Sequence, residues 1–89
     1  MTVYMDVAGV ADVLFESEQL CAKRLFDQAI ALIEDNIEKI NPKDRLNAWY
    51  LAFNIARAKG DTELAKRFML LIDQVNPMQS QTDGAVAAA

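Results

Sequence analysis

Apolar residues recur every three or four positions along most of this chain, which is the spacing that places side chains on one face of a helix. Between Tyr4 and Val75 there are only two glycines and one proline, and β-branched residues are thinly spread. These features favour helix over strand almost everywhere. The pattern therefore predicts an all-α protein of three to four antiparallel helices.

The most clearly marked helix is predicted between Asn41 and Gly60. Asn41 can cap its start, and Pro42 suits the first helical position, where a missing N–H costs nothing. Gly60 is a good left-handed stop, and Lys59 favours the last turn. The residues expected to share one apolar face of this helix are Leu46, Trp49, Tyr50, Phe53 and Ala56.

A second helix is predicted from Asp61, its N-cap, to Asn76–Pro77, where the residue before proline avoids the helical region. Glu63 and Arg67 are expected to form an ion pair four residues apart. With the preceding helix, this segment predicts a helical hairpin with a very short turn. Its expected buried stripe consists of Leu64, Ala65, Phe68, Leu71, Ile72 and Val75.

The first forty residues also predict helices, but they contain few boundary signals. A helix over residues 6–15 would bury four side chains, Val7, Val10, Val13 and Leu14. An apolar stripe then continues over residues 22–40. The helix that carries it begins either with Ser17 as N-cap or after a break near Lys23–Arg24. Residues 1–77 thus form one predicted helical domain, and 78–89, rich in Gln, Ser and Ala, are expected to be a disordered tail.

The segment Asn47–Pro77 resembles a tetratricopeptide repeat, a helix–turn–helix unit with a period of about 34 residues. Trp49 stands where the family has its first aromatic residue, Ala65 at the small position of the second helix, and Pro77 at the closing proline. Gly60–Asp61 stands at the turn. The family's leucine, glycine, tyrosine and second-helix aromatic are replaced here, in that order, by Ala52, Phe53, Ala56 and Met69.

A fainter copy of the unit covers Val10–Pro42, with Ala29 opposite Ala65 and no glycine at its turn. The two prolines of the chain, Pro42 and Pro77, are separated by about one repeat period. The resemblance implies one or two helical hairpins that bind a peptide or helix in a groove.

Composition points to a partner as well. Hydrophobic residues make up 53% of only 89 residues, and a chain this short has little interior in which to bury them. The net charge is −4 and the basic residues are scattered, which argues against nucleic-acid binding. No apolar run is long enough to span a bilayer and no signal peptide is visible, so the sequence predicts a cytoplasmic protein without a membrane partner.

The residues that most enzymes need are scarce in this chain. There is no histidine, the three glycines lie far apart, and the one cysteine, Cys21, is expected to be a small buried hydrophobe. The acidic pairs, such as Glu34–Glu38, are those of a solvated helix face. We therefore expect no catalytic, cofactor-binding or metal-binding residues, no cofactor, and no enzymatic activity.

The sequence instead predicts a small protein–protein interaction module, acting as an adaptor, chaperone or assembly factor. The aromatic cluster of the hairpin predicts its core, and the alternative is that Tyr50 or Phe53 lies on a surface that receives a partner. The run Met69–Ile72 covers more than one helix face, so one face either forms an interface or is covered by a terminal segment that folds back. The alternative is a structural subunit of a phage particle or secretion complex, acting as an obligate oligomer. In either case the partner is a protein helix, a peptide or another copy of the chain. The expected partner-binding residues are Tyr50, Phe53, Met69 and Leu70.

Overall fold

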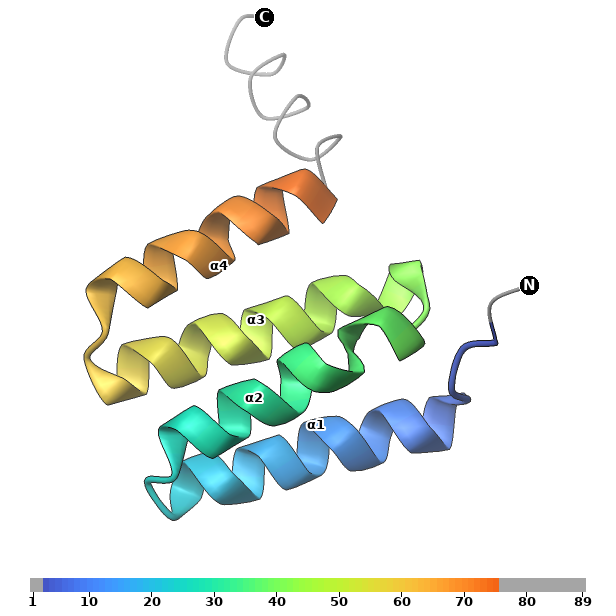
Figure 1. The fold of residues 1–89 in the computed structure, drawn as a ribbon, viewed down its shortest axis with the longest axis horizontal. Coiled ribbons are helices and arrows are strands. Elements are labelled where there is room, and N and C mark those ends of the chain that lie inside the picture. The colour runs from blue at the N-terminus through green and yellow to red at the C-terminus, as the bar shows by residue number, and fades with distance from the viewer. Residues whose placement is uncertain (1–2, 76–89) are drawn as a thin grey trace, which may run out of the picture.

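The computed structural model describes residues 3–75, and these residues form four α-helices joined by short turns (Figure 1). No strand occurs within them, so the predicted all-α fold is confirmed. The expected tail, residues 78–89, and the closing Pro77 lie outside the described residues. The helices are α1 (Val7–Ala22), α2 (Phe26–Asn36), α3 (Pro42–Lys59) and α4 (Thr62–Val75), with a 3₁₀ helix, η1 (Ile37–Lys39), after α2.

Helix α1 is longer than the predicted segment over residues 6–15. Asp6 caps its start, accepting a hydrogen bond from the Gly9 backbone N–H at 2.8 Å. Ser17 is not an N-cap: it lies in the middle of α1, where it is fully buried. Val7, expected in the core, is 79% exposed, and it is the first residue of α1.

The break near Lys23–Arg24 separates α1 from α2. Arg24 adopts a left-handed conformation with φ 63°. Its N–H donates to the carbonyl of Cys21 and the Leu25 N–H donates to that of Leu20, which is the Schellman pattern of a helix end. The sequence offered no glycine as a marker of this turn. The expected stripe over residues 22–40 is thus divided among the turn, α2 and η1.

Helix α3 has the bounds predicted from its caps. The Asn41 side chain accepts a hydrogen bond from the Lys43 N–H at 3.0 Å, and Pro42 occupies the first helical position. Gly60 ends the helix with φ 84°, and the Asp61 N–H donates to the Ala56 carbonyl. The turn from α3 to α4 therefore repeats the Schellman geometry of the turn from α1 to α2.

Arg45 joins η1 to the start of α3. Its guanidinium donates to the carbonyls of Ile37, Glu38 and Ile40, over distances of 2.8–3.2 Å. The same group lies over the Tyr4 ring, 5.8 Å from the ring centroid. The orphan carbonyls at the end of η1 are thus satisfied by a side chain from the next helix.

The core differs from the expected one most clearly on α3. Its fully covered residues are mostly small, because α3 packs against α4 on one side and against α1 and α2 on the other. The predicted aromatic face is only partly covered: Trp49 and Phe53 are half-buried and Tyr50 is exposed. Cys21 is half-buried against the same core. The buried residues of α3 are Ala48, Ala52, Ile55 and Ala56.

Helix α4 buries three residues of its predicted stripe, Ala65, Phe68 and Ile72. Asp61 caps it as expected, accepting from the Leu64 N–H at 3.1 Å. The predicted ion pair between Glu63 and Arg67 is wrong in its basic partner. Glu63 Oε1 lies 3.9 Å from Lys66 Nζ instead.

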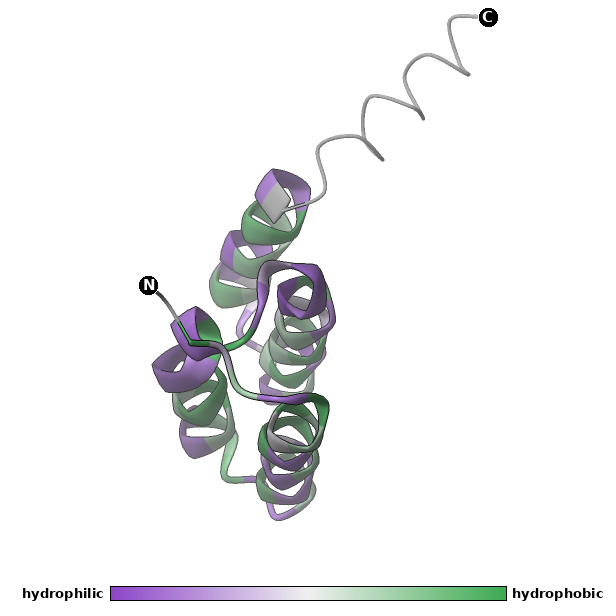
Figure 2. Cartoon of the chain, turned by 90° about the vertical axis from the view of Figure 1, so that its right-hand side faces the viewer, coloured by the Kyte–Doolittle hydropathy of each residue, from purple (hydrophilic) through white to green (hydrophobic). Residues whose placement is uncertain are grey.

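The helices follow one another across a flat layer, with α2 and α3 lying between α1 and α4 (Figure 1). Viewed along the helices, successive helices alternate between the two sides of this layer (Figure 2). The described part of the chain measures 45 × 38 × 17 Å, and 17 Å is less than two helix diameters. Such a thin layer leaves a large share of every helix at the surface. None of the helices in residues 3–75 combines the length and apolar character needed to cross a bilayer.

Candidate interaction surface

An open groove of about 400 Å³ runs along one side of the α3–α4 hairpin. We call it the hairpin groove. Phe53 from α3 and Met69 from α4 face each other across it, and Ala65 and the turn residue Gly60 complete its apolar part. Its lining residues are Phe53, Arg57, Gly60, Thr62, Ala65, Lys66 and Met69.

Helical periodicity explains why these residues meet. On α3, Phe53 and Arg57 are four residues apart, so they share one side of the helix. On α4, the same spacing joins Ala65 to Met69. Space remains between Phe53 and Met69 because residue 65 is an alanine and residue 60 has no side chain.

Aromatic packing joins α3 to α4 farther from the turn. Trp49 of α3 stacks on Phe68 of α4, with ring centroids 5.6 Å apart and the planes 27° from parallel. Trp49 precedes Phe53 by four residues, so it lies on the same side of α3, one turn farther from Gly60. The two helices are therefore packed at the aromatic pair, and the groove lies between this pair and the turn.

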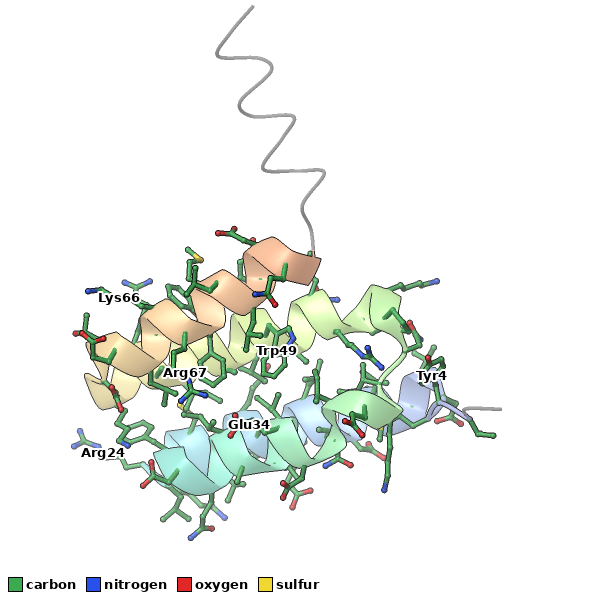
Figure 3. All side chains as sticks on the ribbon, turned by 45° about the horizontal axis from the view of Figure 1, so that its top comes forward. Tyr4, Arg24, Glu34, Trp49, Lys66 and Arg67 are labelled. Atoms are coloured by element: carbon green, nitrogen blue, oxygen red, sulfur yellow. The ribbon has the colours of Figure 1, made fainter. Side chains whose placement is uncertain are left out.

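Two basic side chains line the rim of the hairpin groove. The Arg57 guanidinium lies 5.6 Å from the centroid of the Phe53 ring, within the range of a cation–π contact. Lys66 lies on the other wall and its only ion pair in residues 3–75 is the long one to Glu63. Figure 3 shows Lys66 and its neighbour Arg67 leaving α4 in different directions, with Arg67 directed toward Glu34 on α2. The groove thus combines an apolar floor with positive charge on both walls.

The structure brings together two of the four predicted partner-binding residues. Phe53 and Met69, the latter 43% exposed, face each other in the hairpin groove. Tyr50 is 42% exposed one turn before Phe53 on α3, beyond the groove lining. Leu70 is 62% exposed, but it follows the buried Phe68 by two residues and so lies about 200° away, on the outer side of α4.

Arg57, Ala65 and Lys66 are groove residues that the sequence analysis did not single out. A signal for two of them exists in the sequence, since Arg57 follows Phe53 by four residues and Ala65 precedes Met69 by four. A second set was also missed, the exposed apolar residues of α1, because Val7 was assigned to the core.

A smaller hollow, of about 220 Å³, lies between the start of α2 and the end of α3. Lys59 Nζ lies 2.7 Å from Asp27 Oδ1 and 3.8 Å from Asp61 Oδ2. The hydrogen bond to Asp27 and the nearby carboxylates raise the pKa of Lys59. The pair with Asp27 ties α3 to α2 and so joins the two hairpins, and this is a sufficient structural role for the cluster.

Comparison with protein-family models, with curated proteins and with solved structures found no match to this chain. The tetratricopeptide resemblance stays a prediction based on the residues of Asn47–Pro77. Any assignment of function therefore depends on the surface of the molecule itself.

Proposed function

We propose that this protein is a small, non-enzymatic interaction module that takes up the apolar face of a partner helix or peptide in the hairpin groove. The observation that carries the proposal is the pairing of two apolar lining residues, Phe53 and Met69, with the basic rim residues Arg57 and Lys66. Aromatic residues, Met and Arg are enriched in protein interfaces relative to the rest of the surface.

The chemistry of the groove selects the kind of partner. Its apolar floor suits an apolar side chain, which gains free energy when it leaves water. Arg57 and Lys66 suit carboxylates on either side of that side chain, with Arg57 able to bind one through two parallel hydrogen bonds. The favoured ligand is therefore an amphipathic helix or peptide with acidic flanks, and its affinity should fall as salt concentration rises.

The thin architecture also supports a binding role. Helical repeats bury their faces against neighbouring repeats, and about three are usually needed for stability. Two hairpins leave much of their helix surface uncovered, and the open groove lies between the two helices of the second hairpin. The alternative function, a structural subunit that assembles with its own copies, is favoured by a different observation, the exposed apolar side of α1.

Photocrosslinking at two adjacent positions tests this function. A benzophenone amino acid is placed at residue 69 in one variant and at residue 70 in the other, and each is irradiated in the native host cell. Both positions are exposed apolar residues of α4, but only Met69 lines the groove. We expect a discrete protein adduct from position 69 and little or none from position 70.

The Met69→Glu variant, carrying the same crosslinker at position 53, provides a second measurement. The glutamate at position 69 places a charge in the apolar lining of the groove and should remove the adduct. Leu70→Glu should leave the adduct unchanged. Equal adducts from positions 69 and 70, or an adduct that survives Met69→Glu, would contradict binding in the hairpin groove.

A further inference from the structure

Helix α1 carries an exposed apolar stripe on its outer side. Val7, Ala11 and Phe15 recur every four residues and therefore lie along one side of the helix. Val7 is 79% and Phe15 61% exposed. The buried Val10 and Ser17 lie on the inner side of α1, toward α2 and α3. We call the three outer residues the α1 stripe.

The α1 stripe lies in an acidic setting. Helix α1 contains three acidic residues, Asp12, Glu16 and Glu18, and no basic one. By helical geometry, Asp12 and Glu16 follow Ala11 and Phe15 by one residue and lie along one flank of the stripe, and Glu18 lies one turn beyond Phe15. All three acidic side chains are exposed, and no ion pair joins them to another residue within 3–75. The stripe is thus an apolar ridge with negative charge along one flank and at its C-terminal end.

We propose that the α1 stripe of one copy docks in the hairpin groove of a second copy, so that the chains associate head to tail. The inference rests on the proposed function, because it names the occupant of the groove. The apolar ridge meets the apolar lining of the groove, and the acidic residues of α1 meet Arg57 and Lys66 on its walls. The lengths also agree: the stripe spans about 12 Å and the walls from Phe53 to Gly60 about 10 Å, at about 1.5 Å per residue.

The stripe cannot reach the groove of its own chain. Helices α2 and α3 lie between α1 and α4 (Figure 1), so the body of the protein separates the stripe on α1 from the α4 wall of the groove. The contact therefore requires another copy. Since α1 and the groove are different surfaces, a pair of copies keeps one free stripe and one free groove, and the assembly grows into a ring or a chain.

Electrostatics disfavours the symmetric alternatives. Two α1 stripes packed together would bring six carboxylates close to one another, three from each helix. Two hairpin grooves packed together would oppose four basic side chains. Like charges across an interface suppress pairing, whereas the head-to-tail contact brings opposite charges together.

Complementation of two interface variants tests the proposal. Phe15→Glu places a charge in the stripe and leaves the groove intact, while Met69→Glu does the reverse. Analytical ultracentrifugation should show concentration-dependent association of the wild type and self-association at least about tenfold weaker in each variant. An equimolar mixture of the two variants should form a 1:1 dimer, because one intact stripe and one intact groove remain. Leu70→Glu is the matched control and should associate like the wild type.

Three results would overturn head-to-tail docking. A wild type that stays monomeric at high micromolar concentration would exclude it. Association of Met69→Glu alone would indicate a contact between two α1 stripes, and association of Phe15→Glu alone a contact between two grooves. Helix content measured by circular dichroism confirms that each variant folds, as expected from the exposure of both sites. Association should also weaken when salt is raised, because opposite charges meet at the contact.

The mass of the in-cell adduct from position 69 separates the two proposals. An adduct of two copies, each of 9.9 kDa, supports both. An adduct with a different protein, together with a monomeric wild type, would overturn head-to-tail docking and leave the proposed function supported. The absence of any specific adduct, combined with a monomeric wild type, would overturn both.

Discussion

The two interhelical turns use one backbone geometry with different residues, and this leads to a paired prediction. Arg24 has φ 63° and Gly60 has φ 84°, and both lie at the left-handed position of a Schellman turn. A side chain in this region crowds the following carbonyl, at about 1–2 kcal/mol, whereas glycine adopts it without strain. Arg24→Gly should therefore stabilise the fold, and Gly60→Ala should destabilise it.

The magnitude follows from two opposing effects. Relief of the left-handed strain at Arg24 contributes about 1–2 kcal/mol, and the greater freedom of glycine in the unfolded chain removes about 0.4–1 kcal/mol of this. The net gain is about 0.5–1 kcal/mol. At Gly60 the sign reverses with the same size, since a Cβ there would meet no atom within 4 Å and only the backbone is strained.

Urea unfolding followed by circular dichroism and by the fluorescence of Trp49, the single tryptophan, measures both effects. Low micromolar protein keeps association from contributing to stability. The midpoints should move in opposite directions at constant slope. Arg24→Ala is the control, since it removes the exposed side chain and keeps the strain, and it should leave stability nearly unchanged. A neutral or destabilising Arg24→Gly beside a destabilising Gly60→Ala would refute this account of the first turn.

Three further predictions concern single sites. The hydroxyl of Ser17 is buried without a hydrogen-bond partner in residues 3–75, so Ser17→Ala should raise the free energy of unfolding by about 1 kcal/mol in the same urea assay. Arg45→Ala should lower it by about 2 kcal/mol, because carbonyls at the end of η1 lose a charged donor. Asp27→Asn should lower the thermal midpoint near pH 7. Because the pKa of Lys59 is raised in the folded state, this difference should be fully present below the ordinary lysine pKa and disappear as pH rises through the raised value.

Helix ends with local signals were predictable from the sequence alone. Asn41–Pro42 at the start of α3, Gly60 at its end and Asp61 at the start of α4 each act through groups within a few residues along the chain. Such caps depend on backbone donors and acceptors that neighbouring side chains reach directly. The bounds of α3 and the start of α4 were therefore predicted correctly.

The first turn could not be predicted in the same way. Arg24 has no intrinsic preference for a left-handed conformation, and the turn is held by packing of α1 against α2 together with its two backbone hydrogen bonds. Ser17 shows the same limit, because its side chain suits a helix cap as well as a small buried position. Only the neighbouring helices decide between the two.

The candidate site, too, was determined partly by the sequence and partly by the tertiary structure. Apolar periodicity and composition by themselves determined that the protein is helical and that it has more apolar surface than its interior can hold. Only the tertiary structure decided which apolar side chains stay outside. Small residues fill the contact side of α3 because the helices on both sides approach closely there, and this leaves Phe53 at a groove. Periodicity identifies the faces of a helix, but the position of the neighbouring helices determines which face is buried.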